Sequence, residues 1–129
     1  MPDLSDADLV SQFEDTSLPT LSHRDHVRLV YLYTVESDAD AAYARVRDGL
    51  IAFTRSLGAS HYFHETRTWA WARLVASAAV ADGEGDFDAF AARHPEFERR
   101  DLLNDYYAPG VLDSDEAHDG IVEPTLKSF

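Results

Sequence analysis

Apolar residues recur at intervals of three and four along most of this 129-residue chain, which is the period of an amphipathic α-helix. A first short helix is predicted over residues 6–13, with Ser5 as its N-cap. A second helix begins after Ser22, where the pattern S-x-x-D predicts a capping box with Asp25. Its apolar positions cover more than one stripe, so we expect it to lie at the centre of the fold.

The same period continues through the rest of the chain. A third helix is predicted from Asp38 or Asp40 to Leu57-Gly58, where the glycine provides a C-terminal stop. Further helices are predicted over residues 61–81, 87–93 and 97–107, and the tail from residue 108 is predicted to be mostly loop. No segment shows the alternation of a strand, so the sequence predicts an all-α fold, a compact single-domain bundle of about five or six helices.

Composition narrows the range of partners. The chain has 24 acidic residues against 11 basic ones, a formal charge of -13, and such a field disfavours nucleic acid and anionic membranes. The absence of cysteine excludes disulfides and thiolate chemistry. Neither a signal peptide nor a long apolar run is present, so we expect a cytoplasmic, soluble protein. The oligomeric state stays open.

Histidines are the candidate functional residues. His23 and His26 lie one turn apart at the start of the second helix, and His61 and His64 have the same spacing at the start of the predicted helix 61–81. If these two helices run parallel, with the third as the return, all four imidazoles converge at one end of the bundle, with Glu65 beside them. His94 and His118, in contrast, are interpreted as polar residues near helix ends.

A resemblance to other proteins supports the same candidate site. The runs HRDHVRLVYLY, YFHETRTWAWARLVA and DLLNDYYAPGVLDSDEA resemble an uncharacterised family of small all-helical bacterial proteins with H-x-x-H and Y-H-E-T motifs. Phe63 stands where that family usually has tyrosine. The resemblance implies a site at His23, His26, His64 and Glu65, and it implies no particular reaction.

Two kinds of chemistry suit these side chains. Imidazoles and a carboxylate can bind a divalent transition metal such as Zn²⁺, Fe²⁺ or Cu²⁺, with His23, His26, His64 and Glu65 as ligands. Alternatively, His26, His64 and Glu65 act as catalytic groups that transfer protons without a metal. The sequence leaves the cofactor open.

The aromatic residues beside these histidines complete the hypothesis. Tyr33, Thr68 and Trp71 follow them along the same helix faces and are the predicted substrate pocket, although the packing of small helical domains also places large aromatics in the core. We therefore expect an enzyme that acts on a small organic molecule. The alternatives are a non-catalytic small-molecule or metal-binding protein that uses the same pocket, and an interaction module that uses an exposed apolar patch.

Overall fold

The computed structural model describes residues 4–129 and contains helices and no strand in that range, which confirms the predicted all-α fold. Its six α-helices are connected by loops and three short 3₁₀ turns. The α-helices are α1 (Asp6–Glu14), α2 (His23–Glu36), α3 (Ala39–Ser56), α4 (Glu65–Asp82), α5 (Phe87–Arg93) and α6 (Asp115–Asp119), and the 3₁₀ turns are η1 (Ser60–Tyr62), η2 (Pro95–Glu98) and η3 (Leu102–Asp105). No helix among residues 4–129 is long and apolar enough to cross a membrane.

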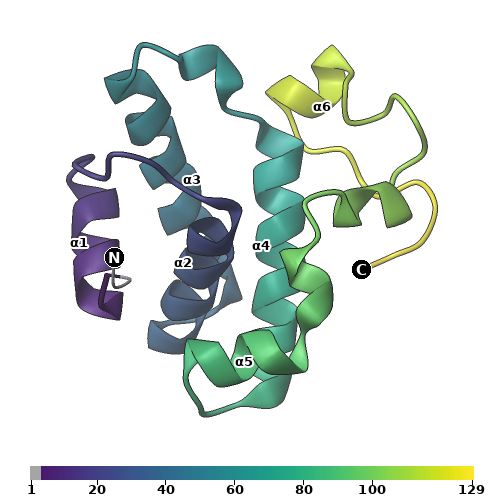
Figure 1. Ribbon diagram of the computed structural model, residues 1–129. Helices are drawn as coiled ribbons and strands as arrows, with labels where there is room; N and C mark the ends of the chain where they lie inside the picture. Colours follow the sequence, from purple (N-terminus) through teal and green to yellow (C-terminus); the bar gives the residue numbers. More distant parts are fainter. Residues whose placement is uncertain (1–3) are drawn as a thin grey trace.

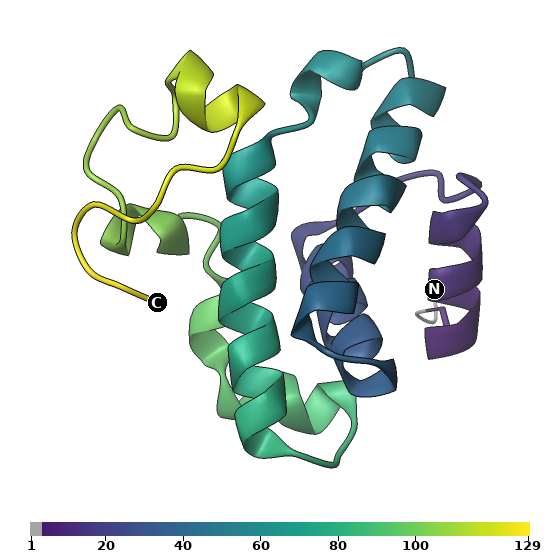
Figure 2. The ribbon, with the colours of Figure 1, turned by 180° about the vertical axis from the view of Figure 1, so that it is seen from behind.

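Helices α2, α3 and α4 form the centre of the molecule, and each packs against the other two. Figures 1 and 2 show that α2 and α4 run in the same general direction and that α3, which connects them in the sequence, runs in the opposite direction. Short connections impose this up-down-up order. The parallel arrangement of α2 and α4 that the sequence predicted is therefore confirmed.

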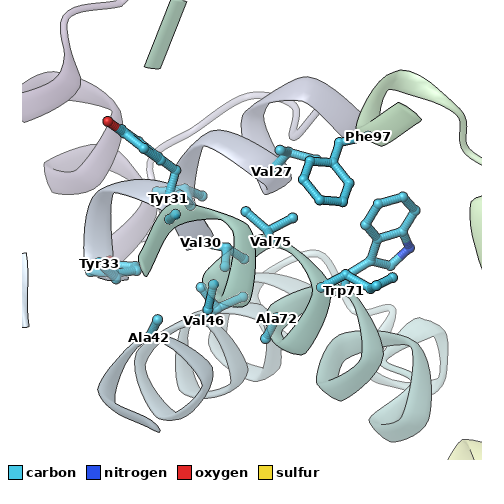
Figure 3. Close-up of a cluster of buried hydrophobic side chains, with 14 of the residues drawn as sticks. Val27, Val30, Tyr31, Tyr33, Ala42, Val46, Trp71, Ala72, Val75 and Phe97 are labelled. Carbon is cyan, nitrogen blue, oxygen red and sulfur yellow. The ribbon is translucent and has the colours of Figure 1, made fainter. Parts of the chain in front are cut away.

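One hydrophobic core joins the three central helices. Small residues of α3, Ala42 and Val46, are fully buried against Val30 of α2 and Val75 of α4, and their size lets the helix axes approach closely. Larger rings close the edges of this cluster (Figure 3), where Phe97 lies beside Trp71. Helices α2 and α4 therefore have buried apolar residues on more than one face, as the sequence predicted for α2.

Helix starts and stops follow local side chains. The capping box is present, since Ser22 Oγ accepts from the amide of Asp25 at 3.0 Å and a carboxylate oxygen of Asp25 accepts from the amide of Ser22 at 3.2 Å. Asp38, not Asp40, caps α3. Gly58 follows that helix with φ 67°, a conformation that favours glycine.

Two predicted helices differ from the structure. Helix α4 begins at Glu65 and not at residue 61, because residues 60–62 form η1 and Phe63 has an extended backbone. Residues 97–107 form no α-helix, since Arg99 is extended with ψ 115° and separates η2 from η3. The tail, predicted as mostly loop, also contains the short helix α6.

Candidate functional site

His64 is the N-cap of α4. Its Nδ1 accepts a hydrogen bond from the amide of Arg67 at 3.0 Å, and its Nε2 lies 2.7 Å from the carbonyl oxygen of Leu112. A carbonyl only accepts, so Nε2 must be the protonated nitrogen and the ring is neutral. Burial lowers the pKa of His64, in agreement with a neutral ring. Both nitrogens are thus used in holding the chain.

Glu65, the first residue of α4, faces α3. The Tyr43 hydroxyl donates to Oε2 at 2.7 Å, and Arg47 donates through Nε to both carboxylate oxygens at 2.9 and 3.0 Å. Burial raises the pKa of Glu65, but the hydrogen bonds from Arg47 and Tyr43 outweigh that effect and leave the pKa below its ordinary value. The carboxylate is therefore an anion already held by a cation and a hydroxyl.

Thr66, next along the chain, binds the C-terminal segment. It is fully buried, and its hydroxyl donates to the carbonyl of Gly120 at 2.6 Å while accepting from the amide of Val122 at 3.0 Å. His118 adds another link, with Nε2 2.8 Å from the carbonyl of His61. The start of α4 is thus the place where the C-terminal segment is fixed.

His23 and His26 occupy the first turn of α2 with different surroundings. Nε2 of His23 lies 2.7 Å from the carbonyl oxygen of Phe97, and its ring meets that of Trp71 edge-on at 4.7 Å. Nε2 of His26 is buried without a hydrogen-bond partner. Burial, and secondarily the neighbouring His23, lowers the pKa of His26 to about 4. At neutral pH His26 is therefore uncharged.

The structure does not assemble the predicted metal centre. Among residues 4–129 no three His, Asp or Glu side chains are grouped so that they could hold a metal ion. His23 lies beside Trp71 of α4. Trp71 comes seven residues after His64, which corresponds to about 10 Å along the helix axis. Parallel packing therefore does not bring the two helix starts together, because they are staggered. The exposed His61 lies in η1 and is not on the α4 face at all.

The predicted pocket residues Tyr33, Thr68 and Trp71 all lie in the core. The Tyr33 hydroxyl donates to Glu14 of α1 at 3.0 Å. The Thr68 hydroxyl donates to the carbonyl of His64 at 2.7 Å, within its own helix. Trp71 contacts the rings of His23 and Phe97. Their role in a substrate pocket, like the catalytic roles of His26, His64 and Glu65, stays a prediction.

A half-enclosed cavity of about 280 Å³ lies where α5 and η2 pack against the first turns of α2. We call it the α2–α5 pocket. Its apolar wall consists of Val27, Phe87, Phe90, Ala91 and Phe97. Its polar lining consists of Ser22, His23, Arg24, His94, Glu98 and Arg100. His23 is the one residue of the predicted site that the pocket contains.

Hydrogen bonds orient both imidazoles of this pocket. Nε2 of His23 donates to the carbonyl of Phe97, so Nδ1 is the nitrogen left for a further hydrogen bond. His94 lies between two carboxylates, with Nε2 2.8 Å from Asp82 and Nδ1 3.2 Å from Glu96. The backbone of a lining residue therefore orients His23, and two carboxylates that do not line the cavity orient His94.

Sequence reasoning missed most of this pocket. His94 was interpreted only as a polar residue near a helix end, and it is indeed the C-cap of α5. The signal available was the density of rings, since residues 87–97 contain three phenylalanines and a histidine. Helical spacing placed these rings in two separate helices, whereas the break between α5 and η2 brings them together over α2.

Comparisons with known proteins add no relative. No protein-family model, no curated protein and no solved structure matches this chain. The resemblance to an uncharacterised bacterial family stays a prediction, and the functional argument rests on the geometry of the chain itself.

Proposed function

We propose that this protein binds a small, largely apolar organic molecule in the α2–α5 pocket. The observation that supports this most directly is a cavity of about 280 Å³ with an apolar wall and a few oriented polar groups, which is the usual constitution of a small-molecule site. The volume suits a molecule of one or two fused rings.

His23 provides the polar contact. Its ring is held by the carbonyl of Phe97 and by the edge of Trp71, so the orientation of Nδ1 is fixed before a ligand arrives. A hydroxyl or amine of the ligand can donate to that nitrogen at little entropic cost. The pairing of an apolar wall with one acceptor favours a ring that carries a polar substituent.

Catalysis is the second candidate, and the same histidine supports it. An imidazole whose N–H is bound to a carbonyl presents a free lone pair, which is the arrangement of a general base. In this proposal the protein is an enzyme that transfers a proton of the bound molecule through His23. Non-catalytic capture differs from it only by the absence of turnover.

Filling the cavity tests the binding proposal. Ala91 lines the pocket, whereas the neighbouring Ala92 is exposed and does not, so Ala91→Trp and Ala92→Trp form a matched pair. Indole, phenol and 2-naphthol are titrated into ¹⁵N-labelled protein while amide chemical shifts are followed. We expect saturable shifts over residues 22–27 and 87–98 in the wild type and Ala92→Trp, and none in Ala91→Trp.

Two controls keep the result interpretable. Circular dichroism and thermal unfolding establish that Ala91→Trp is folded, and Ala91→Leu, which fills less of the cavity, should show weakened binding in between. Binding that persists unchanged in Ala91→Trp, or shifts that map to other residues, would overturn the proposal. Turnover of any bound compound that His23→Phe abolishes would then separate catalysis from capture.

A further inference from the structure

We propose that the ligand of the α2–α5 pocket is a planar aromatic carboxylate. The inference rests on the proposed function and specifies the chemical class that this pocket accepts. Two features of the lining support it: the wall contains several stacked aromatic rings, and the polar lining has two arginines against one carboxylate.

The apolar wall consists of rings with similar orientations. Phe90 and Phe97 are 5.9 Å apart with 16° between their planes, and His94 and Phe97 are 5.6 Å apart with 30°. Phe87 continues the series, 6.2 Å from Phe90 at 29°. Phe87, Phe90 and Phe97 are 4%, 0% and 6% exposed, so they pack mainly on one another and only small parts of them line the cavity. An aromatic ligand gains about 0.5–1.5 kcal/mol per ring contact beyond its buried area. A saturated ring of the same volume gains no such contact.

The lining charge is positive in a strongly negative protein. Arg24 and Arg100 are in the lining with one carboxylate, Glu98, although the whole chain has a charge of -13. Within residues 4–129 no carboxylate lies within 4.0 Å of Arg100. Within the described residues this exposed guanidinium makes no ion pair, so it is available to a ligand, and its planar fork matches a carboxylate.

Arg24, in contrast, is engaged in ion pairs. It pairs with Asp88 at 3.2 Å and with Glu98 at 3.8 Å, and it lies over the ring of Phe87 at 4.9 Å. Both carboxylates are largely exposed, so each pair is weak. Arg24 thus supplies positive potential at the mouth, next to the aromatic wall, while Arg100 supplies the direct contact.

Matched probes separate charge from shape. Affinities of 2-naphthoate, its neutral isostere 2-naphthamide and its saturated counterpart decahydro-2-naphthoate are measured by chemical-shift titration of the full chain. We expect 2-naphthoate to bind about tenfold tighter than 2-naphthamide, the ratio typical of one charge-assisted contact. We expect decahydro-2-naphthoate to bind at least tenfold more weakly than 2-naphthoate, since it has the same two rings but cannot stack.

Arginine variants assign the contact. Arg100→Gln should remove the preference for 2-naphthoate and leave the affinity for 2-naphthamide unchanged. Arg73→Gln removes the same charge from α4 away from this pocket and should preserve the preference. Equal loss in both variants would mean that only the overall charge matters, which contradicts the inference.

The outcomes also distinguish this inference from the proposed function. If 2-naphthamide binds in the pocket as tightly as 2-naphthoate, the pocket takes neutral rings and the carboxylate assignment is wrong while the proposed function stands. If decahydro-2-naphthoate binds as tightly as 2-naphthoate, the aromatic assignment is wrong. If none of the probes shifts residues 22–27 and 87–98, the proposed function itself fails.

Discussion

The imidazole of His64 donates a hydrogen bond of 2.7 Å to the carbonyl oxygen of Leu112, 48 residues later in the chain. Its other nitrogen accepts from the amide of Arg67 and so caps α4. One side chain therefore both begins a central helix and attaches the C-terminal segment to it. A histidine with these two contacts has a structural function whatever else it does.

The first prediction follows from that double contact. His64→Ala should lower the free energy of unfolding by about 1–3 kcal/mol, because an N-cap is worth about 1 kcal/mol and the carbonyl of Leu112 loses its donor. His61→Ala, at an exposed position, should change it by less than about 0.5 kcal/mol. Urea unfolding measures both, and equal stabilities of the two variants would contradict the structural role of His64.

Local signals in the sequence predicted the helices well, because their causes are local. Apolar periodicity gave α1, α2 and α3, and side chains within three residues of each start fixed the caps, as with Ser22 and Asp38. The start of α4 was misplaced because its cap is a histidine, a residue that no capping rule singles out. Residues 61–81 contain no proline or glycine, so no helix-breaking residue marked the later start.

The candidate site was harder to predict because it depends on pairs far apart in the chain. Stagger between α2 and α4 is set by packing, and no periodicity reveals that His23 will meet Trp71. The hydrogen bond from Thr66 spans 54 residues, which no local spacing anticipates. Only His23 of the predicted constellation reaches the α2–α5 pocket, since α5 and η2 pack on the first turns of α2, whereas the start of α4 lies against the C-terminal segment.

A second prediction concerns Glu65. The ion pair with Arg47 depresses the pKa of this carboxyl, so its stabilising effect is present above the pKa of the unfolded chain and is lost as pH falls through the folded value. Arg47 is partly exposed, so a double-mutant cycle of Glu65→Gln and Arg47→Gln at pH 7 should give a coupling of about 0.5–1 kcal/mol.

The same cycle repeated at acid pH provides the check. The coupling should decrease as pH falls through the folded pKa of Glu65, which lies below the ordinary value, because a protonated carboxyl carries no charge. A coupling that does not change over the whole acid range in which the protein stays folded would show that the charge of Glu65 contributes nothing to the pair.

A third prediction uses the buried nitrogen of His26. Its pKa is lowered to about 4, mainly by burial, so between that value and the ordinary 6.5 the unfolded chain binds a proton that the folded chain does not. Stability due to this residue is therefore full above pH 6.5 and falls as pH drops toward 4. His26→Leu should lose this pH dependence and, by removing an unpaired polar atom, be at least as stable as wild type near pH 5.

The difference between variant and wild type isolates His26, because His64 and the carboxylates titrate in both. Proton NMR of the histidine ring signals measures the pKa directly. A His26 titration midpoint above 6 would contradict the burial of its Nε2.

A fourth prediction tests the contact of α1 with α3. Replacing a glycine inside a helix with alanine normally adds about 1 kcal/mol of stability. At Gly49 an added Cβ would collide with the ring of Phe13, which is fully buried and cannot move aside freely. We therefore expect Gly49→Ala to destabilise by about 1–3 kcal/mol. The double variant Gly49→Ala with Phe13→Leu should recover part of that loss. Thermal unfolding of the wild type, Gly49→Ala and the double variant measures both changes in stability.

The last prediction compares two buried threonines that lie two residues apart on α4, Thr66 and Thr68. The hydroxyl of Thr66 bonds both Gly120 and Val122, far along the chain, so Thr66→Val removes the partner of one carbonyl and one amide. Because Gly120 and Val122 are only partly buried, that should cost about 1–2 kcal/mol. The hydroxyl of Thr68 bonds the carbonyl of His64, which already accepts from the amide of Thr68, so Thr68→Val should cost less than about 1 kcal/mol.

Hydrogen exchange then locates the effect. Because Thr66 attaches the C-terminal segment and Thr68 does not, Thr66→Val should accelerate amide exchange over residues 112–122 selectively, with α2 and α3 little changed. Thr68→Val has the same shape and the same loss of a hydroxyl, so it controls for both. If the two variants accelerate exchange of that segment equally, the segment is held by apolar packing and not by the hydroxyl of Thr66.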